Sequence, residues 1–262
     1  LENMQFYYQK NAYTQTHPLT RERINDAKYA AKNENCTNNE KIKESNEIRS
    51  AVLTTDEKYK FIQAKLIGFT DPENTLISIK NNSKFNNDQK TYALAIANYK
   101  LFNLEKGNEL INKLIKKHPS NPYFYELKAQ MLRENGFLKE SLNNYLIVNK
   151  LLPNDPLVKI ELAHTLINLE SKKTLDESIK KLLEAEKKES ENDKLWYLLS
   201  VAYGKNSEMG KSKYASAYSF YLKGDDVMAL NFIERAKKII EKNSATWVKL
   251  INLENKINLK KK

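Results

Sequence analysis

Few side chains in this sequence have the type and spacing that catalysis or metal binding needs. The candidates are three histidines and one cysteine: His17, His118, His164 and Cys36. The histidines are not spaced as metal ligands, and the sequence contains no HExxH motif, no phosphate-binding glycine loop and no GxSxG motif. A single cysteine cannot form a disulfide within the chain and does not identify the compartment. These residues therefore predict binding rather than catalysis.

The elements that would carry a binding surface recur with a period of 34 residues. Identical residue types return at this spacing, as in Ala95, Ala129 and Ala163, in Leu132 and Leu166, and in Pro119 and Pro153. A period of 34 is typical of tetratricopeptide repeats, in which each unit is a pair of helices. The period predicts an all-α solenoid of helical hairpins.

The clearest unit runs from residue 121 to residue 156. Helical spacing predicts one apolar face on a first helix and one on a second, formed by Tyr125, Ala129 and Leu132 and by Ser141, Tyr145 and Val148. Gly136 is the expected turn between them, and the small residues Ala129 and Ser141 should let the helices approach closely. Pro153 should end the second helix. The unit resembles the tetratricopeptide pattern, although Lys128 replaces its usual leucine. An unrelated helical hairpin protein is the alternative.

The repeats divide the chain into three segments. Residues 1–19 are expected to form a tail, residues 20–87 a helical connector, and residues 88–262 the solenoid. In the connector, apolar residues with helical spacing predict a long helix, which Asp71 and Pro72 should close: Tyr59, Ile62, Leu66 and Phe69.

The third unit departs from the regular spacing. Its small residues Ala163 and Ser178 are 15 residues apart, whereas Ala129 and Ser141 of the second unit are 12 apart. This difference predicts three residues inserted into the hairpin turn, near residues 171–174. The fourth unit, around Trp196, and a fifth helix pair towards the C-terminus should continue the solenoid.

Composition leaves more than one kind of partner open. Lys and Arg exceed Asp and Glu by 44 to 33, and a net charge of +11 suits nucleic acid or anionic lipid. Lysines are spread along every expected helix, however, which favours solvated helix faces. Nucleic-acid binding would show a steep loss of affinity with salt. No apolar run approaches the roughly 18 residues of a membrane span.

Three segments together resemble zinc metallopeptidases of the BepA and HtpX kind. THPLTRERI, residues 16–24, resembles the THP segment that follows their catalytic domain. EKYKFIQAKLIGF resembles their connecting helix, and the region from Trp196 to about residue 239 resembles the last repeats of the BepA-like members. The resemblance implies a periplasmic zinc metalloendopeptidase with a tetratricopeptide domain that recruits substrate or docks on outer-membrane assembly machinery, as part of outer-membrane protein quality control.

The residues that would bind and activate zinc in that family are missing here. The HExxH helix and its downstream glutamate do not occur, so zinc would belong to the parent protein and this segment alone should be inactive and hold no cofactor. Only His17 transfers, as a plug ligand to zinc held by the missing domain. Residues 1–19 would then be a remnant of the protease domain. Because the sequence starts at Leu1 without methionine, we expect a mature or excised fragment. In the alternative interpretation, His17 merely precedes a proline at a helix entry.

In a tetratricopeptide solenoid the first helices line a binding groove. The positions that would face it hold aromatic and charged residues suited to a protein or peptide partner: Tyr92, Ile96, Tyr99, Tyr123, Glu126, Gln130, Arg133, Ile160, His164 and Tyr197. Some of these tyrosines could instead pack within the repeats. A free-standing tetratricopeptide adaptor without a protease is the alternative function, and the two differ in whether an HExxH motif is encoded upstream of Leu1.

Overall fold

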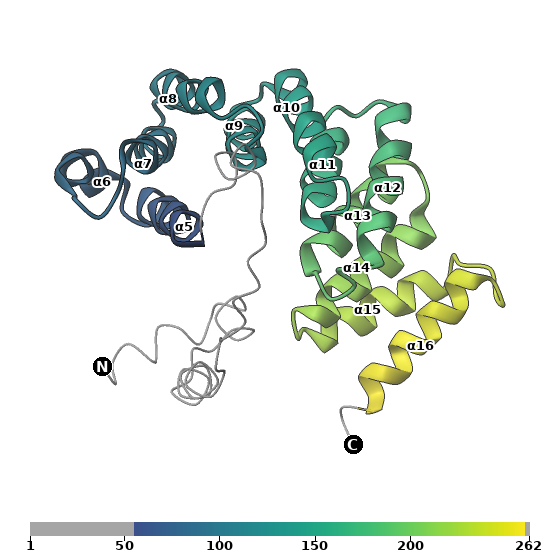
Figure 1. The fold of residues 1–262 in the computed structure, drawn as a ribbon. Coiled ribbons are helices and arrows are strands. Elements are labelled where there is room, and N and C mark those ends of the chain that lie inside the picture. Colours follow the sequence, from purple (N-terminus) through teal and green to yellow (C-terminus); the bar gives the residue numbers. More distant parts are fainter. Residues whose placement is uncertain (1–54, 260–262) are drawn as a thin grey trace, which may run out of the picture. The chain divides into compact units, whose positions relative to one another are not determined.

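The computed structural model describes residues 55–259, and this part of the chain is helical with no strand (Figure 1). The expected tail of residues 1–19, with His17, and the first part of the connector lie outside the described residues. The helices are α5 (Thr55–Thr70), α6 (Pro72–Ser78), the short 3-10 helix η1 (Ile79–Asn81), α7 (Asn87–Lys100), α8 (Leu104–Lys117), α9 (Pro122–Glu134), α10 (Leu138–Leu151), α11 (Pro156–Asn168), α12 (Lys172–Glu186), α13 (Asp193–Lys205), α14 (Met209–Leu222), α15 (Asp226–Lys237) and α16 (Ala245–Leu259).

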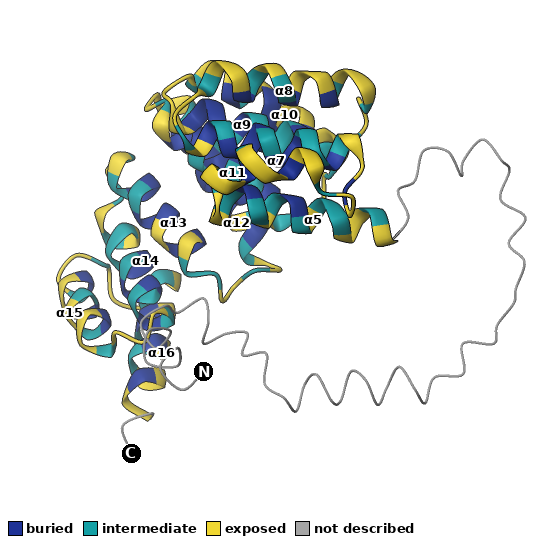
Figure 2. Ribbon diagram, turned by 90° about the vertical axis from the view of Figure 1, so that its left-hand side faces the viewer, coloured by how far each residue is buried: buried dark blue, intermediate teal, exposed yellow. Residues whose placement is uncertain are grey.

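Successive helices pack as hairpins, which confirms the all-α repeat architecture. The pairs α7 and α8, α9 and α10, α11 and α12, and α13 and α14 each pack closely, and α15 and α16 follow at the C-terminal end. Apolar side chains on the sides of the helices that face their neighbours are buried (Figure 2). Each hairpin therefore buries its apolar stripe both within itself and against the next hairpin.

The hairpin turns share one backbone conformation. A residue with a left-handed φ stands at the same place in four turns: Phe102 (63°), Gly136 (84°), Glu170 (57°) and Ser207 (63°). After three of them the next amide N–H donates to a carbonyl five residues earlier: Asn103 to Asn98 (2.8 Å), Phe137 to Leu132 (2.9 Å) and Glu208 to Tyr203 (2.8 Å). This bond pattern ends a helix in a Schellman motif. The predicted turn at Gly136 is confirmed.

Small residues bring the two helices of a hairpin close together, as predicted for Ala129 and Ser141. The Ser141 hydroxyl donates to the Ala129 carbonyl across the hairpin at 2.7 Å, and Ser212 donates to Ser200 at the same distance. In the first hairpin, a Cβ on Gly107 would lie 3.2 Å from the Ala95 carbonyl oxygen. The hydroxyls satisfy buried polar groups at a contact where a larger side chain would push the helices apart.

The insertion expected near residues 171–174 is wrong. The turn between α11 and α12 has three residues, 169–171, as does the turn between α9 and α10, 135–137. Leu175, not Ser178, therefore occupies the place of Ser141, and the Ser178 hydroxyl donates to the Leu175 carbonyl within its own helix at 2.7 Å. The extra residues lengthen the end of α12 and the connection to α13, residues 187–192.

Helix α5 is correctly predicted, but most of the apolar residues whose spacing predicted it do not form its buried face. Tyr59, Ile62 and Leu66 are more than half exposed, and the side that packs on α7 carries Ala64 and Gly68. A Cβ on Gly68 would lie 2.9 Å from the Ala93 carbonyl oxygen and from Ile96 Cβ. Small residues occupy the side of α5 that packs on α7 because they allow the backbones of the two helices to come together.

The short helix predicted after Asp71 and Pro72 is confirmed as α6. The Asp71 side chain accepts a hydrogen bond from the Asn74 amide, and Pro72 is the first residue of the helix, where its missing N–H costs nothing. Phe61 of α5 meets Tyr92 of α7 edge-on at 5.8 Å between ring centroids, so the end of the connector packs directly on the first hairpin.

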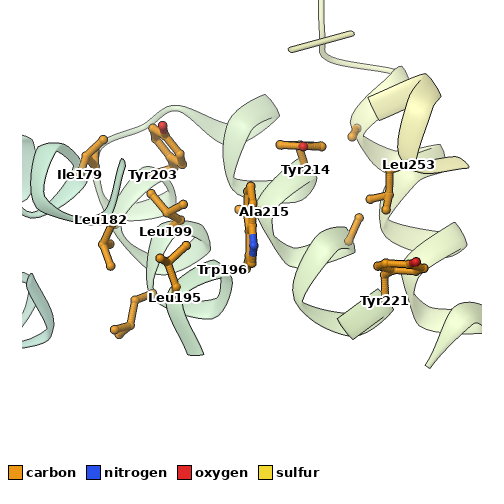
Figure 3. Packing of buried hydrophobic residues seen from close by; sticks show 14 of the residues in the cluster. Ile179, Leu182, Leu195, Trp196, Leu199, Tyr203, Tyr214, Ala215, Tyr221 and Leu253 are labelled. Carbon is orange, nitrogen blue, oxygen red and sulfur yellow. The ribbon is translucent and has the colours of Figure 1, made fainter. Parts of the chain in front are cut away.

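The largest core runs through α11–α16. Trp196 stacks on Tyr218 at 4.1 Å between ring centroids and meets Tyr214 edge-on at 5.8 Å. Figure 3 shows labelled members of this core from Ile179 to Leu253. Because Trp196 lies on α13 while Tyr214 and Tyr218 lie on α14, these aromatic contacts hold the fourth hairpin together.

Candidate protein-binding face

Four of the ten residues expected to line a binding groove are buried in the core, and this part of the prediction is wrong: Tyr92, Ile96, Tyr99 and Ile160. Helix α5 covers the first three, with Phe61 against Tyr92 and Phe69 edge-on to Tyr99 at 6.4 Å. Ile160 belongs to the core that joins α11 to the later helices. The repeat period identifies the helix face but not the neighbour that covers it.

The other six residues lie on the first helices α9, α11 and α13. Tyr123 on α9 and Tyr197 on α13 are 57% and 52% exposed, and Glu126, Gln130 and His164 are half-buried. Arg133 is also buried, with only 8% of its surface exposed, so its expected place in the groove is wrong as well. We call the side of α9, α11 and α13 that carries Tyr123, Glu126, Gln130, His164 and Tyr197 the first-helix face.

A three-residue ion-pair ladder links these first helices. Arg133 Nη1 of α9 donates to Glu161 Oε2 of α11 at 2.7 Å, and Lys194 of α13 pairs with the other carboxylate oxygen of Glu161. Arg133 also donates to the Tyr145 hydroxyl at 3.2 Å, with its guanidinium 5.5 Å from the Tyr145 ring centroid. The buried guanidinium is thus satisfied by hydrogen bonds as well as by charge.

Sequence reasoning missed Glu161, although a signal was present. Glu161 lies 28 residues after Arg133 and 33 before Lys194, so each pair is separated by about one repeat. Opposite charges at that separation on first helices can meet across neighbouring hairpins. In a sequence this rich in lysine and glutamate, the signal does not stand out from solvated charges.

The ladder sets the protonation of the carboxylates around it. Burial alone would raise the pKa of Glu161, but Arg133 and Lys194 together hold it below its ordinary value. Burial raises the pKa of Glu126; Lys65 opposes this, and the charges of Glu161 and Asp155 add to it. The fold therefore stabilises the ionised form of Glu161 and destabilises the ionised form of Glu126.

His164 is held neutral on the same face. Burial, together with the charges of Arg133 and Lys194, lowers its pKa to about 4 against the opposing charge of Glu161. Its Nδ1 atom is buried and has no hydrogen-bond partner within the described residues. His118 is half-buried as well, and its Nε2 lies 2.8 Å from Asp88 Oδ2.

Residues 55–259 contain no group of three or more His, Cys, Asp or Glu side chains arranged to hold a metal ion. The described residues by themselves therefore do not fit a zinc site, and zinc would have to come with other residues. No helix among them has the length and apolarity to cross a membrane.

Replacing Glu161 should destabilise the fold. In Glu161→Gln the buried Arg133 loses its carboxylate, and we expect the free energy of unfolding to fall by about 2 kcal/mol in urea denaturation, because a buried charge loses its counter-ion. Glu109→Gln is the control, since exposed Glu109 pairs with Lys106 and Lys113 in solvent and should give no measurable change. Equal midpoints for both variants and the parent chain would contradict a structural role for the ladder.

The burial of His164 predicts a pH dependence of stability. Its ordinary pKa is 6.5 and its folded pKa is about 4, so the unfolded chain binds more protons between these values. Stability from this group is complete above pH 6.5 and is lost as the pH falls towards 4. His164→Gln should flatten the plot of unfolding free energy against pH in that range. Parallel curves for His164→Gln and the parent chain would show that His164 is not desolvated.

The fold of this chain is similar to that of several solved structures. The chain is similar to a double mutant of MamA RS-1, with a TM-score of 0.50 and 14% identity over 64% of this chain and 95% of that one. It is also similar to MamA from Desulfovibrio magneticus RS-1 (TM-score 0.48, 13% identity, 58% and 94% covered) and to PilF of Pseudomonas aeruginosa (0.47, 11%, 75% and 98%). No family model matches the chain, and the search of curated proteins gave no match. Residues 55–259 have the fold of tetratricopeptide-type helical repeat proteins.

Proposed function

We propose that this chain is a protein-recognition module whose first-helix face binds a segment of another polypeptide. The observation that carries the proposal is the exposure of Tyr123 and Tyr197 on first helices that the ion-pair ladder links. A tyrosine offers a large contact area and a polar end at little entropic cost, which is why tyrosines are enriched in interfaces. Leu157 of α11 is also more than half exposed and adds an apolar side chain between the two tyrosines in sequence.

The rigid setting of this face supports the proposal. Each tyrosine stands on a helix whose opposite side is buried, and Glu161 fixes α9 to α11 and α11 to α13 through its two ion pairs. A preorganised surface spends less free energy on ordering when a partner binds. The partner then gains from contacts with side chains that already hold their positions.

The test compares tyrosines on and off the first-helix face. A protein captured by the chain from cells that produce it is purified, and its affinity is measured by calorimetry. Tyr123→Ala combined with Tyr197→Ala should weaken binding at least about tenfold, since buried interface tyrosines contribute on the order of 1–2 kcal/mol each. Tyr59→Ala, which removes a similarly exposed tyrosine on α5, should leave the affinity unchanged. Unchanged affinity in the double variant, with its circular dichroism intact, would contradict the proposal.

We propose more specifically that this module is part of a zinc metallopeptidase. This proposal rests on the segment THPLTRERI and on the order of the connector and repeats that follow it. In that form the module would bring a periplasmic peptidase to its substrate or to outer-membrane assembly machinery, and binding would raise the local substrate concentration to roughly millimolar. A free-standing adaptor would use the same face without any enzyme.

His17 separates these two forms. If the coding sequence upstream of Leu1 specifies an HExxH domain, His17→Ala in the full-length protein should increase zinc loss to a chelator or raise peptidase activity, because a ligand that closes the site is removed. Zinc content followed by metal analysis during dialysis provides the measurement, with His118→Ala as the control. Identical zinc retention and activity would remove His17 as a ligand, and an upstream sequence without HExxH would favour the adaptor.

A further inference from the structure

We propose that the first-helix face receives a partner segment bearing a lysine or arginine, whose cation lies against the carboxylate of Glu126. The inference rests on the proposed function, because it names the chemistry of the partner at the same face. Glu126 stands on α9 one turn after Tyr123 and one turn before Gln130, so the three side chains share one side of the helix.

Glu126 differs from the other carboxylates nearby in lacking a donor. Glu161 is paired with Arg133 and Lys194, and Glu134 accepts a hydrogen bond from Gln130 at 2.9 Å. Within residues 55–259 Glu126 accepts no hydrogen bond and forms no ion pair, although it is half-buried. A half-buried charge without a partner is unfavourable in the free protein. A cation from outside would supply the missing bonds.

The cations around Glu126 do not form an ion pair with its carboxylate. Arg133 and Lys194 are both committed to Glu161, and Lys65 of α5 acts on Glu126 only at longer range than an ion pair. Glu161 and Asp155 add negative potential at the carboxylate. Burial, opposed by Lys65 and reinforced by these two acids, raises the pKa of Glu126, which agrees with a carboxylate short of positive neighbours.

The aromatic side chains of the face suit contact with a basic side chain. The ammonium of Lys223 already lies 5.8 Å from the ring centroid of Tyr197, so an aromatic ring on this face accepts a cation. Tyr123, one turn from Glu126, is 57% exposed and offers a surface for the apolar stem of a lysine or arginine. A carboxylate beside an exposed ring fits both parts of such a side chain.

The charge of the whole chain makes the inference easy to test. With a net charge of +11, the chain as a whole repels a basic peptide and attracts an acidic one or a nucleic acid. Preference for a basic probe therefore has to come from local groups. Nonspecific electrostatics predicts the opposite order of affinities.

The experiment uses three fluorescent probe peptides of about ten residues, long enough to cross successive helices. The first alternates leucine with lysine, the second replaces each lysine with glutamine, and the third replaces each lysine with glutamate. Binding is measured by fluorescence anisotropy for the parent chain, Glu126→Gln, Tyr123→Ala and Glu140→Gln. Glu140→Gln is the matched control, because it makes the same change of charge at an exposed position on the second helix α10.

We expect the lysine probe to bind best to the parent chain. Glu126→Gln should weaken this probe about tenfold and leave the glutamine probe unchanged, since only a charge-assisted contact is lost. Tyr123→Ala should weaken both the lysine and the glutamine probes, and Glu140→Gln should weaken neither.

The remaining outcomes separate the two proposals. If the glutamine or glutamate probe binds as well as the lysine probe, or Glu126→Gln does not weaken the lysine probe, the basic partner is wrong while Tyr123-dependent binding would keep the proposed function. If none of the probes binds at millimolar concentration and Tyr123→Ala also leaves the captured partner's affinity unchanged, both proposals fail. Preference for a single-stranded DNA probe over all three peptides would also overturn the basic partner.

Discussion

The close approach of two helices within each hairpin is the constraint on which the rest of the structure depends. It is favoured by a small residue on each helix, as Ala129 and Ser141 show, and the serine hydroxyl satisfies the carbonyl that the contact buries. Ser200 and Ser212 repeat the same bond, and Gly107 meets Ala95 without a side chain. The third hairpin has buried Leu175 at this place, so the contact is preferred rather than obligatory. A fixed hairpin spacing also fixes which side of each first helix is left open.

A second constraint acts between hairpins and is electrostatic. Several bonds join residues about one repeat apart, including Lys205 to Glu170 and Lys188 to the Asn154 carbonyl, but these are exposed and each contributes little. Arg133 is different because its guanidinium is buried, where an unpaired charge would be strongly unfavourable. Glu161 is therefore needed for the spacing of α9, α11 and α13 as well as for their attraction. The same carboxylate holds Arg133 and Lys194 in ion pairs within the protein.

Much of the fold could be predicted from the sequence because its signals are local or periodic. The 34-residue period, Gly136 at the turn and Pro72 at a helix start each reflect the backbone conformation of that residue or its neighbours. Apart from the misplaced insertion near residues 171–174, the errors concern which neighbour covers a given face. Tyr92 and Tyr99 were expected in a groove because their own repeat leaves them open, but α5 packs over them. Long-range packing of this kind is absent from helical spacing, and so is the pairing of Glu161.

The first-helix face also shows why net charge is a poor guide to the partner here. Charges in water are largely screened beyond about 8 Å at physiological salt. Helices pack roughly 8–10 Å apart, so lysines on the outer sides of α8, α10 and α12 act only weakly across a hairpin. On the face itself Glu161 pairs with both Arg133 and Lys194, which leaves this group with one positive charge, and the depressed pKa of His164 leaves its ring uncharged. A basic side chain placed at Glu126 therefore contacts a carboxylate that has no ion pair within residues 55–259, and the sign of this charge is opposite to that of the chain as a whole.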